Sequence, residues 1–332
     1  MAVSSRMLRS IEVKPAMPEP TISIVGPVFD EAGSIRAFYT RVREAMDRLN
    51  EPWELLLIDD GSRDGSTDVI LDLSLEDPRV RPVLFARNFG HQIALTAGLD
   101  YSRGQAVVVM DTDLQDPPEL IGELVSKWRE GFEVVYAIRT EREGESWFKK
   151  ATASLFYRLI NRITDVDIPL DTGDFRLLDR KVVEVVKQMR ERHRFPRAMV
   201  AWVGFRQTGL PYKRAARMSG ETKYPLRKML RLAINAVTGF SYFPLQLATY
   251  FGFICAGLSA IAIPIVILIR LSGPSALLGQ ATTLIAVLFL GGVQLISLGI
   301  LGEYVGRLYD EAKGRPLYVL REEPGPVKER DR

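Results

Sequence analysis

Two carboxylates with a spacing suited to metal binding follow a short apolar run in the first half of the chain. Asp111 and Asp113 come directly after AVVVM, and the segment continues as DTDLQDPPE. Because carboxylates one residue apart repel each other, they favour a bound cation, and their oxygens suit Mg²⁺ or Mn²⁺ bridging two phosphates. Gln115 adds a neutral oxygen that can bind the ion or orient one of its ligands. The pattern therefore predicts a divalent-metal site at Asp111, Asp113 and Gln115.

A second acidic pair, Asp59-Asp60, closes the apolar run WELLLI and precedes a glycine-containing loop. A carboxylate at a strand end can accept a hydrogen bond from a ribose or base, although the same residues also suit a turn followed by a helix cap. In the upstream segment GPVFDE, Pro27 and Phe29 can line an apolar slot for a base, with Glu31 near the ribose. The chain has no GxGxxG or GxxxxGK[ST] loop, so a metal and basic side chains must hold any phosphates.

Apolar runs alternate with segments of helical periodicity around these residues, which predicts an α/β fold. Near-continuous apolar strands are typical of sheets covered on both faces, and strand–helix–strand repetition predicts parallel strands joined by right-handed crossovers. Ligands of such sheets bind beyond the carboxyl ends of the strands, where both acidic pairs fall. The expected strands are 21–28, 53–58, 80–85, 106–110 and 133–137, and the expected helices are 32–49, 66–75, 92–102 and 117–130.

Two uncharged apolar runs, 244–269 and 277–302, follow the α/β region. Each exceeds the roughly 20 residues that cross a bilayer, so we expect a transmembrane hairpin rather than a pair of buried helices. Lys and Arg flank the two outer ends, whereas the connecting turn holds only Arg270. Since Lys and Arg favour the cytoplasmic side, both termini and the large domain are expected in the cytosol.

A basic amphipathic segment precedes the first apolar run. Apolar residues recur at helical spacing over 225–242 between Arg227, Lys228 and Arg231, which predicts a helix at the membrane interface, with an ordinary surface helix as the alternative. The net charge of +3 does not indicate a nucleic-acid binder, and one cysteine excludes an internal disulfide. The expected divisions are a flexible tail (1–20), an α/β domain (21–224), a juxtamembrane helix (225–243), two spans (244–306) and a cytosolic tail (307–332).

Six segments of the chain resemble the family-2 glycosyltransferases with the GT-A fold. In order, they are GPVFDE, LLIDDGSRDGST, RNFGHQIALTAGLD, MDTDLQDPPE, DTGDFRLLDR and SGETKYPLRKML, and the resemblance covers residues 20 to about 315. Within the family they are most similar to polyisoprenyl-phosphate glycosyltransferases, in particular bactoprenol glucosyltransferases with two C-terminal spans. Dolichyl-phosphate mannose synthases are the neighbouring branch. The resemblance implies a Rossmann-like, mostly parallel GT-A domain followed by an interface helix and a two-helix membrane hairpin.

The resemblance also implies roles for individual residues. The segment 171–176 matches an acceptor-side loop, with Asp174 as the catalytic carboxylate nearest the attack path and Asp171 second. The structural alternative is that Asp174 pairs with Arg176 or Arg180 on a solvated loop. Phe29 stands where many members have tyrosine, so it offers no hydroxyl. The nucleoside is assigned to Pro27, Phe29, Glu31, Asp60 and Asp111, and the metal and diphosphate to Asp111, Asp113 and Gln115.

Four basic residues match positions that hold donor or lipid phosphates: Arg139, Arg206, Arg217 and Lys223. The last two stand shortly before the first span, so attraction to anionic lipid headgroups would explain them equally well. A lipid phosphate is already an anion near neutral pH. Positioning and charge neutralisation should therefore matter more for its attack on the sugar than general-base catalysis.

The resemblance, with the predicted metal site and spans, implies an inverting, metal-dependent transfer of glucose from UDP-glucose to undecaprenyl phosphate on the cytosolic face of a bacterial inner or plasma membrane. Transfer from GDP-mannose and a catalytically silent nucleotide-sugar-binding scaffold both remain open. A processive polysaccharide synthase is disfavoured because the chain lacks a Gln-x-x-Arg-Trp motif, and a dehydrogenase because it lacks a dinucleotide loop. Small residues in the second span permit close helix contact and favour a homo-oligomer: Gly291, Gly292, Gly299 and Gly302.

Overall fold

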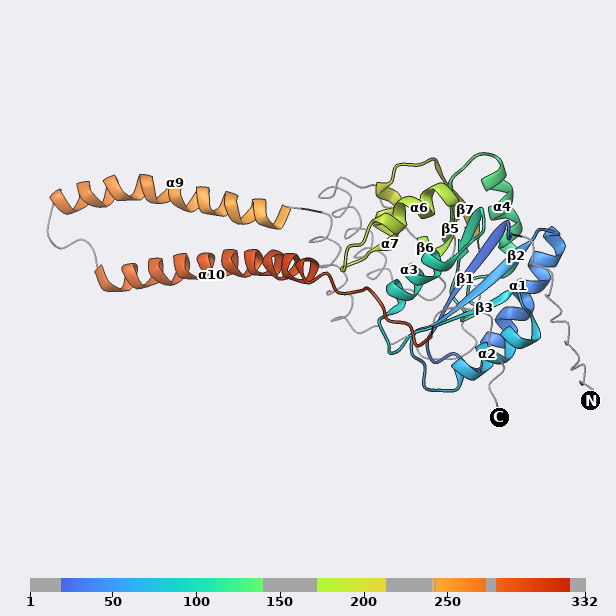
Figure 1. The fold of residues 1–332 in the computed structure, drawn as a ribbon. Coiled ribbons are helices and arrows are strands. Elements are labelled where there is room, and N and C mark those ends of the chain that lie inside the picture. Colours follow the sequence, from blue (N-terminus) through green and yellow to red (C-terminus); the bar gives the residue numbers. More distant parts are fainter. Residues whose placement is uncertain (1–18, 140–171, 213–240, 242, 273–278, 323–332) are drawn as a thin grey trace, which may run out of the picture.

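A seven-stranded sheet forms the centre of the α/β domain, with the strand order β3-β2-β1-β4-β6-β5-β7 (Figure 1). The computed structural model describes residues 19–139, 172–212, 241, 243–272 and 279–322. The sheet is mostly parallel, so the expected GT-A architecture is confirmed. The strands are β1 (Ile22–Val28), β2 (Trp53–Asp59), β3 (Val80–Leu84), β4 (Ala106–Val109), β5 (Val134–Arg139), β6 (Thr172–Asp179) and β7 (Gln207–Tyr212).

Strand β6 runs antiparallel to both of its neighbours, β4 and β5. Its first residues therefore lie beside the carboxyl ends of those strands. Val109 of β4 pairs with Arg176 of β6. Asp111 comes two residues after Val109, and Asp174 comes two residues before Arg176. The antiparallel register therefore brings these two aspartates level with each other at this edge. The segment expected as an acceptor-side loop is thus a strand from Thr172 onward. Its polar start, with Asp174 and Arg176 both buried, does not show the apolar pattern by which the other strands were recognised.

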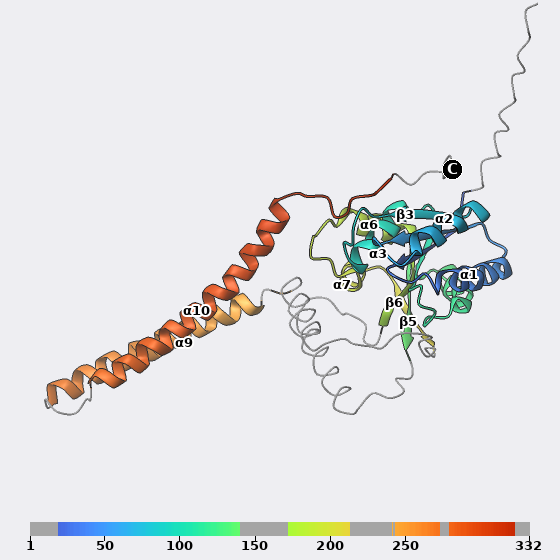
Figure 2. The same cartoon turned by 90° about the horizontal axis from the view of Figure 1, so that it is seen from below.

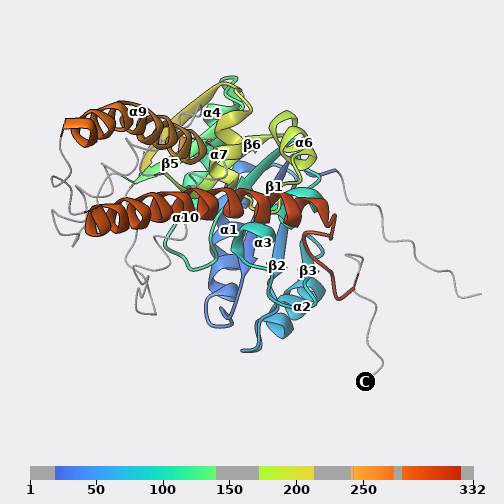
Figure 3. The same cartoon turned by 90° about the vertical axis from the view of Figure 1, so that its left-hand side faces the viewer.

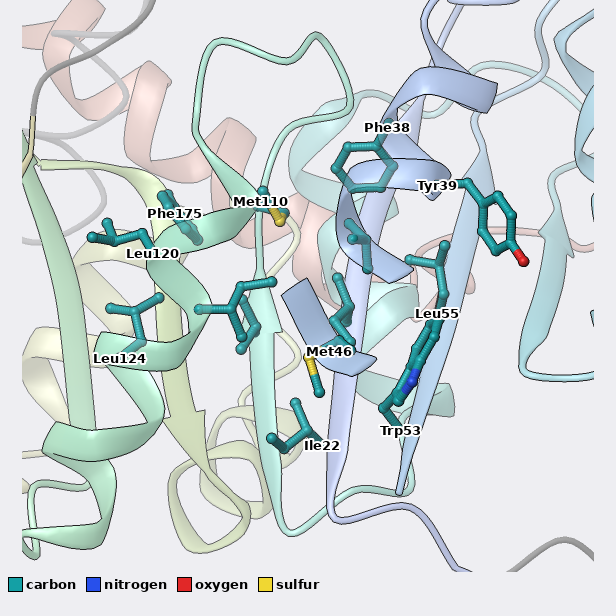
Figure 4. Close-up of a cluster of buried hydrophobic side chains, with 14 of the residues drawn as sticks. Ile22, Phe38, Tyr39, Met46, Trp53, Leu55, Met110, Leu120, Leu124 and Phe175 are labelled. Carbon is teal, nitrogen blue, oxygen red and sulfur yellow. The ribbon is translucent and has the colours of Figure 1, made fainter. Parts of the chain in front are cut away.

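Helices cover both faces of the sheet and enclose a hydrophobic core on each. In the core shown in Figure 4, Phe38 and Met46 of the first helix pack with Leu124 against Ile22 and Leu55 of the sheet. All expected elements of the first 139 residues are present, with ends displaced by up to three residues. One face carries α1 (Ile35–Leu49), α2 (Ser66–Glu76), η1 (Pro118–Leu120) and α4 (Ile121–Arg129), and the other carries α3 (His91–Tyr101), α6 (Arg180–Gln188) and α7 (Pro196–Trp202).

Gly61 is expected to be irreplaceable in the loop after β2. Its φ is +72°, and a Cβ atom there would lie 2.6 Å from the carbonyl carbon of Arg87. Gly61→Ala should therefore cost about 2–3 kcal/mol in the free energy of unfolding, through strain and backbone overlap. Gly33→Ala is the control, because its Cβ would meet nothing within 4 Å. Thermal unfolding of the two variants measures the difference, and equal stability would contradict this account of the loop.

Two long apolar helices, α9 (Phe243–Ser272) and α10 (Gly279–Ala312), lie side by side (Figure 3) and project away from the α/β domain (Figures 1 and 2). Each contains a stretch long and apolar enough to span a membrane, Phe243–Ile265 and Ala286–Ala312. Their large apolar side chains face outward rather than into a protein core. Helix α10 continues beyond residue 306, into the region expected to be a tail.

The chain returns from α10 to the α/β domain. Residues 315–321, here called the docking segment, run beside the outer edge of β3, where Leu320 forms an antiparallel bridge with Phe85 (Figure 1). The ring of Tyr318 stacks on that of Phe85, with centroids 5.1 Å apart. The Tyr318 hydroxyl donates a hydrogen bond to Asp100 Oδ2 at 2.9 Å. A later part of the expected cytosolic tail thus pairs with the end of the outer strand, where Leu84 and Ala86 would otherwise present unpaired backbone groups.

Candidate active site

Four side chains from different parts of the fold meet at the carboxyl edge of the sheet. His91 is the first residue of α3, Asp111 follows β4, Asp174 lies in β6 and Arg197 lies in α7. The Nε2 atom of His91 is 3.2 Å from Asp174 Oδ2 and 3.6 Å from Asp111 Oδ1. Arg197 Nε donates a hydrogen bond to Asp174 Oδ1 at 2.8 Å. A chain of contacts from Asp111 through His91 and Asp174 to Arg197 thus crosses the edge at which such sheets bind their ligands.

Asp111 occupies a position that disfavours its own charge. Its Oδ1 atom is buried and has no hydrogen-bond partner among the described residues. Burial raises the pKa of Asp111 to about 6, although the nearby His91 opposes this shift. A buried carboxylate oxygen that lacks a donor is an electrostatic deficit that a cation would correct. The environment of Asp111 therefore fits the expected divalent-metal site.

The loop after Asp111 is shaped by local backbone geometry. The Gln115 N–H donates to Asp113 Oδ1 at 3.1 Å, and the side chain of Gln115 is buried. Leu114 has a φ of +61°, a left-handed conformation that is uncommon for leucine. Among the described residues, no group of three or more His, Cys, Asp or Glu is arranged to hold a metal. A cation here would therefore have to complete its coordination with ligand oxygens, such as those of a diphosphate.

Asp174 is an ionised carboxylate held between His91 and the cationic Arg197. Burial by itself would raise the pKa of Asp174, but the hydrogen bond to His91 and the charge of Arg197 hold it well below its usual range. Desolvation lowers the pKa of His91, but Asp174 and Asp111 outweigh it and raise the value overall. The buried Arg176 donates to the carbonyl of Gly173 at 2.9 Å, and burial lowers its pKa to about 10. Because a carboxylate of depressed pKa is a weak base, Asp174 is better suited to holding cations than to accepting a proton.

Asp60 shapes the loop that leads into the site. Its two oxygens accept hydrogen bonds from the N–H groups of Phe89 at 2.6 Å and Gly90 at 2.9 Å. Burial raises the pKa of Asp60, although these two donors stabilise its charge. Because this loop ends at His91, Asp60 fixes the start of α3. Its expected contact with a nucleoside stays a prediction beside this structural role.

The end of β1 presents one aromatic side chain to solvent. Phe29 is 48% exposed, whereas Pro27 is buried in the strand and its carbonyl accepts a hydrogen bond from Thr112 Oγ1 at 2.9 Å. The Glu31 N–H donates to Ser66 Oγ at 3.0 Å, which ties this segment to the start of α2. Phe29 can therefore offer its ring to a base. The Pro27 carbonyl holds Thr112 in the loop that follows β4, and the expected contact of Pro27 with a nucleoside stays a prediction.

Arg139 ends β5 and lies at the same edge as Asp174. Its Nε donates to the Tyr212 hydroxyl at 3.3 Å, and that hydroxyl donates in turn to the buried Asp116. Burial and the charge of Asp116 raise the pKa of Tyr212 to about 12, so the phenol keeps its proton. A Cβ on Gly173 would lie 2.6 Å from Arg139 Nη2, so this glycine makes room for the guanidinium beside β6. The position of Arg139 is compatible with its expected phosphate-binding role.

Arg206 does not reach the site, contrary to expectation. It precedes β7, which runs parallel to β5, so Arg206 and Arg139 lie at opposite ends of these paired strands. The Arg206 N–H donates to Glu133 Oε2 at 3.1 Å, and its guanidinium lies over the ring of Phe132. Position in a basic stretch of sequence did not reveal to which end of the sheet the residue belongs. Three other expected residues lie outside the described ranges: Asp171, Arg217 and Lys223. The same holds for residues 225–240 of the expected juxtamembrane helix.

His91 and Arg197 were not among the site residues predicted from the sequence. His91 follows a glycine after the third apolar run, which permits an approach to a ligand but does not require one. Arg197 stands in the charged stretch RERHRFPR, which is typical of a solvated surface. Because β6 runs antiparallel to its neighbours, Asp174 lies between these two side chains. No local sequence pattern predicts that contact.

Residues 23–187 match the family described as Glycosyl transferase family 2. The chain is 51% identical over 303 residues to the uncharacterized glycosyltransferase YkcC of Bacillus subtilis, covering 91% of this chain and 94% of that protein. It is 42% identical over 300 residues to the prophage bactoprenol glucosyl transferase homolog of Escherichia coli, covering 90% and 98% respectively. The bactoprenol glucosyl transferase of Shigella phage SfV is also 42% identical, over 91% of this chain and 98% of its own.

Solved structures are more distant. The mannosyl-3-phosphoglycerate synthase of Rubrobacter xylanophilus is 18% identical and has a TM-score of 0.44, with 65% of this chain and 71% of that chain covered. A similarity of this size does not bear on the site. The sequence relatives, by contrast, align with both the α/β domain and most of the apolar helices, since they cover nine-tenths of this chain.

Proposed function

The chain belongs to glycosyl transferase family 2, and from this membership we propose that it transfers a sugar from a nucleotide donor to a polyisoprenyl phosphate. The observation that carries the proposal is the alignment of 90% of this chain with 98% of a bactoprenol glucosyl transferase homolog. The two apolar helices support it, because a lipid acceptor presents its phosphate at a membrane surface. The buried Oδ1 of Asp111 at the edge of the sheet also supports it, because a cation bound there would attract anionic substrates.

The proposed donor is UDP-glucose, held with its base near Phe29 and its diphosphate near Asp111. The support is that relatives at 42% identity are named as bactoprenol glucosyl transferases or their homologs. GDP-mannose is the second donor to assay, because the chain also resembles the neighbouring dolichyl-phosphate mannose synthases. A competition experiment with unlabelled UDP-glucose, GDP-mannose and other UDP-sugars ranks the donors directly.

A divalent cation, Mg²⁺ or Mn²⁺, would be held by Asp111 and Asp113, with Gln115 beside them. When bound, such an ion offsets the charge that develops on the departing diphosphate. Asp111 contributes a buried oxygen whose charge is disfavoured without a cation. Asp113 is fixed by its hydrogen bond from the Gln115 N–H, so its carboxylate is oriented before any ligand arrives.

The remaining residues position two anions for a single displacement at C1 of the sugar, which inverts that centre. The acceptor phosphate is already ionised near neutral pH, so attack requires little proton transfer. Asp174, with its depressed pKa, holds His91 and Arg197 in place. Arg139 supplies a further cation at the same edge. Catalysis would rest on orientation and electrostatic stabilisation of the two substrates.

The proposed location is a bacterial plasma membrane, with α9 and α10 as a transmembrane hairpin and the α/β domain in the cytosol. Nucleotide sugars are cytosolic, so this orientation brings donor and lipid together. Protease protection in sealed inside-out vesicles tests it, because the α/β domain should be digested without detergent. Self-association into a homo-oligomer is proposed from the small residues of α10, and light scattering in nanodiscs measures it.

Transfer itself is tested by incubating the purified protein with radiolabelled UDP-glucose, Mn²⁺ and undecaprenyl phosphate. Labelled lipid should form, and Asp113→Ala should lower the rate on the order of 10³-fold because a charged ligand of the cation is lost. Asp72→Ala serves as a matched control, since Asp72 is an exposed carboxylate of α2. Full activity in Asp113→Ala would refute the metal assignment. Donor binding without transfer to any polyisoprenyl phosphate would favour the catalytically silent scaffold.

A further inference from the structure

Arg197 is anchored to Asp174 at the carboxyl edge of the sheet and remains partly exposed. Its Nε atom contacts Asp174 Oδ1 at 2.8 Å, and the side chains of Arg197 and Asp174 are 27% and 9% exposed. A guanidinium carries five N–H donors in one plane, and the bond to Asp174 uses the one at Nε. The anchor is therefore buried while the cation it holds remains partly accessible. Asp174 in turn touches His91, which lies 3.6 Å from Asp111.

The charge balance of this edge calls for such a cation. Donor and acceptor are both phosphates, and they must approach a region that already contains several carboxylates. Arg176 is a poor candidate to meet them, because it is only 7% exposed and donates to the carbonyl of Gly173. Arg197 comes from α7, on the far side of Asp174 from His91 along the chain of contacts. Its planar guanidinium matches phosphate oxygens in a way that an ammonium does not.

We propose that Arg197 binds a phosphate oxygen of one of the two substrates and that Asp174 is the positioning residue that orients it. The inference rests on the proposed function and adds a substrate-contacting residue to it. Two phosphates are available, the diphosphate of the nucleotide donor and the phosphate of the lipid acceptor. The same guanidinium chemistry serves either, so the experiment distinguishes them.

The test compares Arg197→Ala and Arg197→Lys with wild type in the full-length protein reconstituted in nanodiscs. KM and kcat are measured with the donor varied at saturating undecaprenyl phosphate, and with the lipid varied at saturating donor. Binding of UDP with Mn²⁺, and of undecaprenyl phosphate, is measured separately by titration. Arg190→Ala is the matched control, because Arg190 donates two hydrogen bonds to Asp100, at 2.8 and 3.1 Å, near the opposite end of α3.

The expected result is a rise of about 10- to 100-fold in the KM of one substrate for Arg197→Ala, the size of a lost charge-assisted hydrogen bond to phosphate. Arg197→Lys should fall between this variant and wild type. The substrate whose KM and dissociation constant move is the one that Arg197 binds. Added guanidinium should restore part of the activity of Arg197→Ala, which a purely structural role would not allow. Asp174→Asn should raise the KM of the same substrate, and the double variant should be little worse than either single one.

The inference is overturned if Arg197→Ala loses stability like Arg190→Ala but leaves both KM values and both dissociation constants within about twofold of wild type. Failure of the proposed function looks different, because wild type itself would then form no lipid-linked sugar. In that event the UDP and undecaprenyl phosphate titrations still decide the inference. Unchanged binding of both probes to Arg197→Ala would refute it, and weakened binding of one would support it.

Discussion

Replacing Asp111 with asparagine is expected to abolish sugar transfer and, at the same time, to stabilise the metal-free protein at neutral pH. The activity should fall on the order of 10³-fold, because the amide cannot supply the charge that a divalent cation requires. The stability should rise because Asp111 is a carboxylate in a place that disfavours ionisation. Its Oδ1 is buried without a hydrogen-bond partner among the described residues, and its pKa is raised to about 6.

The sign of the pH dependence follows from that pKa. The folded protein binds the Asp111 proton more tightly than the unfolded chain, whose aspartates titrate near 3.8. The favourable contribution of the protonated group is therefore complete below about pH 4 and is lost as the pH rises to about 6. Above that range the penalty is at most about 3 kcal/mol, from a shift of about two pKa units. Asp111→Asn removes this penalty.

Thermal unfolding in EDTA from pH 4 to 8 measures the effect. The variant should unfold at a higher temperature than wild type above about pH 6, and the two should converge toward pH 4. Glu184→Gln is a control carboxylate, because this exposed residue is paired with lysine and arginine and its pKa is lowered. If Asp111→Asn is less stable than wild type at pH 7.5, Asp111 carries no electrostatic penalty and the reason for a cation at this position disappears.

Removal of the Tyr318 side chain is expected to release the docking segment and to destabilise the α/β domain. Tyr318→Ala loses the ring that stacks on Phe85 and leaves the nearly buried Asp100 without one of its donors. These losses together should cost about 2–4 kcal/mol in the free energy of unfolding. Burial and Asp100 raise the pKa of Tyr318, so its hydroxyl stays a donor throughout the neutral range.

Two further variants separate the ring from the hydroxyl. Tyr318→Phe keeps the stacking on Phe85 and should cost only about 1–2 kcal/mol, the penalty for one lost hydrogen bond to a charged group. Val319→Ala removes a side chain that is 48% exposed and should change stability by less than about 0.5 kcal/mol. Limited proteolysis after α10 should cut Tyr318→Ala faster than wild type. Equal cleavage and stability in all three variants would mean that the docking segment does not hold the domain.

The sequence by itself determined the local elements and the features that depend on them. Strands and helices of the first 139 residues were predicted to within three residues of their observed ends, because apolar periodicity is a local property that burial on one or both faces imposes. The position of Asp111 at a strand end followed from the same pattern. The two apolar helices followed from length and composition alone, which are also local.

Only the tertiary structure decided which distant residues meet. Strand β6 has a polar start and runs against its neighbours, so its residues Asp174 and Arg176 were not recognised as part of the sheet. That antiparallel entry places Asp174 between His91 and Arg197, which are separated by more than one hundred residues of sequence. Contacts of this kind arise from strand order and direction, and neither leaves a periodic trace in the residues concerned.

Strand direction also explains why one basic residue was misplaced and another was overlooked. Arg139 is the last residue of β5, whereas Arg206 precedes the first residue of β7, so the two lie at opposite ends of these paired strands. The site lies at the carboxyl ends of the strands. Arg197 looked like surface charge because the partner that orients it, Asp174, lies 23 positions earlier in a different element. The sequence shows which side chains carry a charge, whereas the fold decides which other residues those charged side chains contact.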